Sequence, residues 1–201
     1  MNPQVLQRFV KYMFVFILVV GAGYILLQEP LGRAPGDYYT EVGGNRLRDS
    51  DWKGAMEAFD KALKEAPNHR GAMMGKAIVY IQTKQHAKAI AELDKLIAFL
   101  EKTLKADDPT GRGTLAAAFA NRGIVHDREG RFELALNDYA ISLRIDPDSV
   151  SGPDLFHRIV HGRQSTIRKR AEYIAQQLKL PPEKRLLRVP EVDEKQRMHR
   201  P

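Results

Sequence analysis

A spaced pattern of small and aromatic residues occurs three times along this chain of 201 residues. The three copies read Tyr39-x2-Val42-Gly43…Ala55-x3-Phe59…Pro67, then Met73-x2-Lys76-Ala77-x2-Tyr80…Ala89-x3-Leu93, then Phe119-x2-Arg122-Gly123…Ala135-x3-Tyr139…Pro147. Small residues allow two helix backbones to approach closely, and large residues fill the space on either side. Because one such hairpin cannot bury its apolar stripe alone, the repetition predicts stacked helical hairpins rather than a single closed core.

The spaced residues resemble the tetratricopeptide repeat (TPR) family over roughly residues 36–150. The resemblance implies an all-α fold, a TPR-type α-solenoid of three helical hairpins within residues 37–150. The repeats span 36–69, 70–103 and 116–149. Ala89 and Ala135 are 46 positions apart, 12 more than the 34 that separate Ala55 and Ala89. We expect this insertion to lengthen the second helix of the second repeat, and Thr114 to cap the helix that follows.

An uncharged apolar segment at residues 12–27 predicts a transmembrane anchor. It separates a short stub, residues 1–11, from a linker at residues 28–36. A cleaved secretory signal is the alternative interpretation, but the apolar stretch is long for a signal core and no obvious processing site follows it. Arg8 and Lys11 precede the segment, so the positive-inside rule places the stub in the cytoplasm.

The net charge of +7 lies mainly in the last 51 residues. Residues 36–150 have 17 basic and 18 acidic side chains, which makes a nucleic-acid-binding solenoid an unsuitable interpretation. The chain has no cysteine, which excludes disulfides, thiolate metal sites and lipidated cysteine anchors.

The C-terminal part predicts a helical cap at residues 151–180 and a disordered basic tail at residues 181–201. The apolar positions of the longer cap helix are Ile167, Ala171, Ile174, Ala175 and Leu178. Its outward polar face would comprise Arg168, Lys169, Arg170, Glu172 and Gln176.

The resemblance to TPR proteins also implies which residues line the concave surface. A groove floored by small residues and walled by apolar ones would suit an amphipathic helix or an extended peptide. The floor residues are Gly44, Gly71, Gly75, Ala117 and Ala120. The partner-binding residues that we predict are Thr40, Leu47, Met74, Ile78, Ile81, Ala120 and Ile124. The alternative is that these side chains are core residues, or that the chain's own tail covers the groove.

The sequence predicts no enzyme, metal site, cofactor or small-molecule substrate. His157 and His161 have helical spacing, but no third ligand is evident, so we interpret them as solvated or packed. Some TPR proteins clamp a C-terminal carboxylate of heat-shock chaperones with Lys, Arg and Asn side chains. The corresponding residues here, Thr40, Gly44, Gly75, Ala117 and Asn121, do not match that clamp.

Together these patterns predict a membrane-anchored TPR adaptor that binds a partner protein. We expect it in a bacterial inner membrane, with the repeats in the periplasm and a role in envelope protein assembly or secretion. Two alternatives stay open: an import receptor on an organelle membrane with cytosolic repeats, and a permanent structural subunit of a membrane complex.

Overall fold

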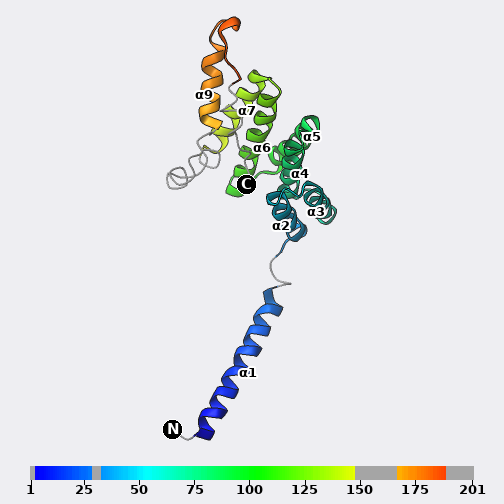
Figure 1. The fold of residues 1–201 in the computed structure, drawn as a ribbon, viewed down its shortest axis with the longest axis vertical. Coiled ribbons are helices and arrows are strands. Elements are labelled where there is room, and N and C mark those ends of the chain that lie inside the picture. The colour runs from blue at the N-terminus through cyan, green and yellow to red at the C-terminus, as the bar shows by residue number, and fades with distance from the viewer. Residues whose placement is uncertain (1–2, 29–32, 148–166, 189–201) are drawn as a thin grey trace.

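The computed structural model describes residues 3–28, 33–147 and 167–188, and all regular structure in these ranges is helical. An N-terminal helix, α1 (Pro3–Gln28), precedes three helix pairs (Figure 1). The helices of these pairs are α2 (Asp37–Arg48), α3 (Trp52–Glu65), α4 (Arg70–Gln82), α5 (His86–Thr103), α6 (Pro109–Arg128) and α7 (Phe132–Ile145). A further helix, α9 (Ile167–Leu178), and a 3₁₀ turn, η1 (Pro182–Lys184), complete the described part.

Helix α1 leaves its apolar side chains uncovered. It projects away from the packed helices in Figure 1, and Phe9, Phe14 and Phe16 are each more than half exposed. Residues Gln4–Gly23 are long and apolar enough to cross a membrane. The helix therefore extends on the N-terminal side well beyond the predicted segment 12–27.

Three antiparallel hairpins form the solenoid, and the predicted fold class is confirmed. The first hairpin consists of α2 and α3, the second of α4 and α5, and the third of α6 and α7. The repeated alanines Ala55, Ala89 and Ala135 are fully buried where the helices of each hairpin approach. A Cβ atom built on Gly123 would lie 2.8 Å from the Tyr139 ring, so the helix contact at this position requires glycine.

The 12-residue insertion lengthens two helices rather than one. Helix α5 has 18 residues and α6 has 20, against 13 or 14 in α3, α4 and α7. Asp108 caps α6, because its Oδ1 accepts a hydrogen bond from the Gly111 amide at 2.7 Å, and Pro109 follows at the first helical position. The prediction that Thr114 caps this helix is wrong, since Thr114 lies inside α6 and donates to the Thr110 carbonyl.

Two equivalent ion-pair systems join successive hairpins. Lys76 of α4 donates to Asp60 of α3, and 46 positions later Arg122 of α6 donates to Asp94 of α5, both at 2.7 Å. Asp60 and Asp94 are themselves 34 positions apart. Arg122 also donates two hydrogen bonds to Asp138, which raise the pKa of its guanidinium above the usual value. We call the two contacts between successive hairpins, Lys76–Asp60 and Arg122–Asp94, the stacking pairs.

Helix α9 covers the third hairpin. Its residues Ile167, Ala171 and Ile174 pack with Ala120 and Ile124 of α6, as expected of a cap. Arg170 differs from the prediction: instead of facing solvent, it is buried and donates two hydrogen bonds of 2.7 Å to Asp127 of α6. The outward face of the cap is therefore less basic than the sequence pattern indicates.

Residues 181–188, which we predicted as the start of a disordered tail, form η1 and a following segment that contacts the cap. Arg170 donates to the Leu187 carbonyl at 3.0 Å, and the Arg188 guanidinium donates to the Arg128 carbonyl. These bonds hold the segment beside the turn between α6 and α7. The rest of the predicted tail and the first part of the predicted cap lie outside the described residues, as do His157 and His161.

Candidate functional site

Six of the seven predicted partner-binding residues lie in the interior of the solenoid. Only Thr40 is partly accessible. The buried six are Leu47, Met74, Ile78, Ile81, Ala120 and Ile124, each at most 4% exposed. This burial favours the alternative that these side chains are core residues. Their role in binding a partner stays a prediction.

The central part of the predicted groove is filled by packing between α4 and α6. Met74, Ile78 and Ile81 share one core cluster with Leu115 and Ala117. The Asn121 amide contacts the Met74 sulfur at 3.3 Å, which brings the two helices together at their inner faces. No open apolar surface is therefore present at these positions in the described part of the chain.

The glycine at position 75 serves packing and not a ligand. A Cβ atom built there would lie 2.3 Å from Cζ of Phe59. The ring of Phe59 occupies the space that we expected as part of the groove floor. Gly71, another predicted floor residue, faces the Thr40 methyl group, which a Cβ atom would approach to 3.2 Å.

Thr40 belongs to a polar trio at the start of the solenoid. The Asp37 Oδ1 atom lies 2.8 Å from Nε2 of His69, and the Thr40 hydroxyl lies 3.3 Å from Nδ1 of the same ring. Nδ1 also accepts the Ala72 amide and so caps α4, which places the ring proton on Nε2 toward Asp37. The hydrogen bond from His69 holds the pKa of Asp37 below its usual value.

A pocket of about 490 Å³ opens beside this trio. We call it the linker pocket, because the end of the linker forms one wall. Its lining comprises Ala34, Asp37, Asn68, His69, Arg70, Phe99, Leu100, Thr103, Leu104 and Asp108. The pocket thus combines the linker, the turn between α3 and α4, and the lengthened end of α5.

One ion pair fixes the far wall of the linker pocket. Arg70 at the start of α4 donates to Oδ2 of Asp108 at 2.6 Å. The Gly111 amide and then Arg70 hold the pKa of Asp108 below its usual value, so the carboxylate stays ionised at neutral pH. With apolar Phe99 and Leu104 nearby, the pocket offers an apolar wall and hydrogen-bonding groups to the same ligand.

Sequence reasoning missed the linker pocket because its walls combine ends of the first two repeats with the linker and the insertion. Thr103 belongs to the extension of α5, Leu104 is the C-cap of that helix, and Ala34 belongs to the linker. The one available signal was Asn68-His69 directly after Pro67, a turn followed by a helix start. That signal locates the cap of α4 but not the walls around it.

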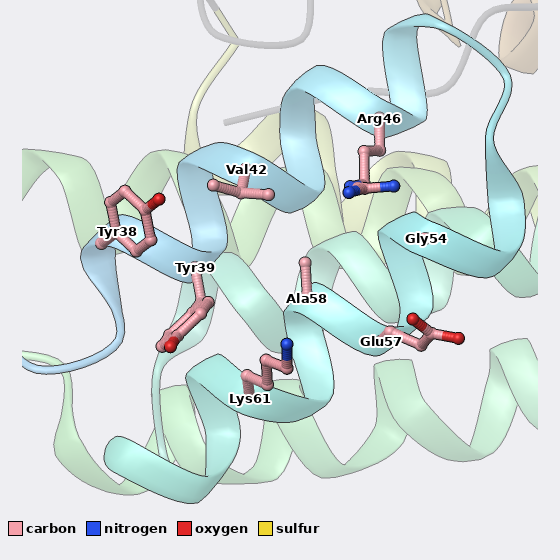
Figure 2. Close-up of a pocket in the computed structure, with 8 residues that line it drawn as sticks. All are labelled: Tyr38, Tyr39, Val42, Arg46, Gly54, Glu57, Ala58 and Lys61. Atoms are coloured by element: carbon pink, nitrogen blue, oxygen red, sulfur yellow. The ribbon is translucent and has the colours of Figure 1, made fainter.

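A second depression, of about 200 Å³, lies between α2 and α3 on the outer face of the first hairpin. Figure 2 shows Tyr38, Val42 and Arg46 along α2 and Ala58, Glu57 and Lys61 along α3. Tyr39 and Gly54 complete the lining. We call this surface the first-hairpin groove.

One buried histidine belongs to the core and not to either pocket. His126 of α6 lies with Nε2 3.7 Å from Asp138, and its Nδ1 atom has no hydrogen-bond partner. Burial lowers the pKa of this ring, with a further contribution from Arg131. Among the described residues, no group of three His, Asp or Glu side chains is placed to hold a metal ion.

Comparisons with known proteins support the repeat fold. A family model described as tetratricopeptide repeat matches residues 46–107. No curated protein matches the sequence.

Three solved structures share the fold at low sequence identity. They are the first TPR of Spaghetti (RPAP3) bound to the HSP90 peptide SRMEEVD, with 16% identity and a TM-score of 0.52; the N-terminal domain of stress-induced protein-1 (STI-1) from C. elegans, with 18% and 0.53; and the first TPR domain of the human RPAP3 protein, with 16% and 0.52. The matches cover 72–73% of this chain and 93–99% of those chains.

Proposed function

We propose that this protein is a membrane-anchored TPR adaptor that binds a protein partner at the end of the solenoid nearest the membrane. One observation carries the proposal. A long helix with uncovered apolar side chains is followed, within a few residues, by a solenoid whose first accessible pocket adjoins the linker. Lipid is the medium that makes such a helix favourable.

The end of the linker is attached to the solenoid by hydrogen bonds. The Ala34 amide donates to Asp37 at 3.0 Å, and the Gly36 amide donates to Glu65 of α3 at 3.0 Å. Gly36 has a φ of 88°, a left-handed conformation that favours glycine. Only residues 29–32 separate α1 from this attached segment, so the linker pocket stays close to the point where the chain leaves the membrane.

The chemistry of the linker pocket suits a short peptide from the partner. Phe99 and Leu104 would contact an apolar side chain, while Asn68 and Thr103 would hydrogen-bond to its backbone. The Spaghetti TPR is bound to an HSP90 peptide, which supports peptide binding as a use of this fold. The present chain lacks the matching clamp residues, so we propose a ligand held by an internal apolar side chain and not by a terminal carboxylate.

Photo-crosslinking from the pocket tests this proposal. A photoreactive amino acid at Thr103 or Asn68, both exposed lining residues, should capture one dominant protein in cells. The same probe at Glu101, exposed on another face of α5, serves as the control. Thr103→Trp should reduce capture from Asn68 at least about tenfold by filling the pocket, whereas Glu101→Trp should not. Equal capture from Glu101, or no capture from either lining residue, would contradict the proposal.

We also propose that the protein lies in a bacterial inner membrane with its repeats in the periplasm, where it would serve envelope protein assembly or secretion. The support is the pair Arg8 and Lys11 before the apolar segment, compared with Arg33 and Glu29 after it. A C-terminal alkaline phosphatase fusion should then be active and a C-terminal fluorescent reporter that folds only in the cytoplasm should be dark. The reverse result would place the repeats in the cytosol and favour a receptor-type function.

A further inference from the structure

The stacking pairs show which residues a hairpin presents on the face that packs against the preceding hairpin, which we call its receiving face. In the second and third hairpins, the cation on the receiving face is Lys76 or Arg122, and each contacts an acid of the preceding hairpin. The same face carries a small residue, Ala72 or Ala118, that is fully buried by the contact. Both junctions are therefore heterologous, because a cation on one side meets an acid on the other.

The first hairpin carries different residues at the equivalent positions. Counting back 34 residues, Lys76 corresponds to Val42, Glu92 to Ala58 and Ala72 to Tyr38. Thus an aromatic residue and two uncharged residues occupy the face that lacks a preceding hairpin in the described chain. Tyr38 is 54% exposed, one of few large apolar side chains outside α1 that are so accessible.

The two ends of the solenoid are consequently unlike. Helix α9 covers the third hairpin, as a terminal cap should. Ala140 occupies the position of Asp60 and Asp94 there, so the acid is absent where no further hairpin stacks. At the other end, Tyr38 and Val42 of α2 are not fully covered, although terminal caps normally present a polar outer face.

We propose that the first-hairpin groove is the contact surface between two copies of this chain, arranged about a two-fold axis. In such an isologous interface each residue near the axis meets its own counterpart, so a charge at the centre would face a like charge. Val42 meets this requirement, and a lysine at position 42, the counterpart of Lys76 of the second hairpin, would violate it. A preceding hairpin that carried the repeat acid would not find the repeat cation at position 42.

The charges at the rim of the groove are self-complementary. Glu57 and Lys61 are exposed neighbours one turn apart on α3. When two α3 helices cross antiparallel about an axis midway between Glu57 and Lys61, Glu57 of each copy approaches Lys61 of the other. Arg46, the other charged lining residue, is neutralised within its own copy by Asp51 at 2.7 Å.

The position of the groove also suits two copies in one membrane. It lies on the hairpin that directly follows the linker, and the Arg33 guanidinium of the linker lies 5.8 Å from the centre of the Tyr38 ring. Two anchored copies can therefore meet at this face without leaving the membrane surface. Anchoring both to one bilayer raises their effective concentration, so a modest interface suffices.

Charge exchange across the groove tests the inference. The full-length protein in nanodiscs or mild detergent should be a dimer by mass photometry. Glu57→Lys and Lys61→Glu should each weaken the dimer at least about tenfold, because each opposes like charges across the axis. The double variant Glu57→Lys/Lys61→Glu should restore it. Both side chains are exposed, so the fold is preserved, which circular dichroism would verify.

A second test uses the absence of cysteine. Val42→Cys should yield a disulfide-linked or bismaleimide-linked dimer in membranes, whereas Asn45→Cys, exposed elsewhere on α2, should not. A monomer at all concentrations, or a double charge variant no better than the singles, would overturn the inference. A Val42→Cys link to a different protein, or burial of a fluorophore at Tyr38 in lipid, would assign the groove to that occupant instead.

Discussion

Replacing Asp127 by alanine is expected to lower the free energy of unfolding by about 3–5 kcal/mol, because it leaves the Arg170 guanidinium buried without the carboxylate that it contacts. Both side chains are 1% exposed, and the Tyr139 hydroxyl also donates to Asp127 at 3.2 Å. The ion pair joins α6 to α9, so the loss should release the cap first. Urea unfolding of the full-length protein, with hydrogen exchange across residues 167–188, measures both effects.

The control is an ion pair with the same nitrogen–oxygen distance that lies at the surface. Asp94 contacts Arg122 at 2.7 Å and is 51% exposed, so Asp94→Ala should cost less than about 1 kcal/mol. Asp127→Leu combined with Arg170→Met should be less destabilised than Asp127→Ala, since a buried apolar pair leaves no charge without a counterion. Equal losses in Asp94→Ala and Asp127→Ala would show that this buried pair does not hold the cap.

The repeat pattern alone was sufficient to predict the solenoid. Small residues at fixed spacing mark the places where two helices approach closely. The alanines at these places, Ala55, Ala77, Ala89 and Ala135, are all fully buried in the structure. The cap helix was likewise predictable, since Ile167, Ala171 and Ile174 mark one face at helical spacing. These contacts depend on the spacing of residues that are close in the sequence, so they can be predicted from one sequence.

The groove could not be predicted in the same way, because its openness depends on where the third hairpin lies. The insertion changes the start of α6, and Met74, Ile78 and Ile81 pack in the same cluster as this helix. A signal was present in the run Leu115-Ala116-Ala117-Ala118-Phe119-Ala120. A helix that is apolar on all sides is normally buried on all sides, which argues against an exposed concave face at these positions.

Long-range ion pairs were the other unpredictable feature. Arg170 lies among Arg168 and Lys169, and a basic run on a helix is usually solvated. Its burial depends on Asp127 of α6, 43 positions earlier in the sequence. Composition and periodicity do not identify which member of a basic run meets an acid on another helix.

Replacing Phe59 by alanine is expected to cost about 3–5 kcal/mol, because the side chain is 2% exposed and fills the space between three helices. Its ring contacts α2 and α4, where Cβ atoms at Gly43 and Gly75 would lie 2.5 and 2.3 Å from it. Thermal unfolding of the full-length protein, followed by circular dichroism, should show a large decrease in the melting temperature.

Two alanine substitutions separate ring packing from helix propensity. Gly75→Ala should destabilise by about 1–3 kcal/mol, since Gly43 on the opposite side prevents the ring from moving away. Gly44→Ala, on a helix with open space around its Cβ, should be neutral or stabilise by up to about 1 kcal/mol. In a Phe59→Leu background the cost of Gly75→Ala should fall, because the methyl group then has room. An unchanged cost would mean that contact with the Phe59 ring is not what requires glycine at position 75.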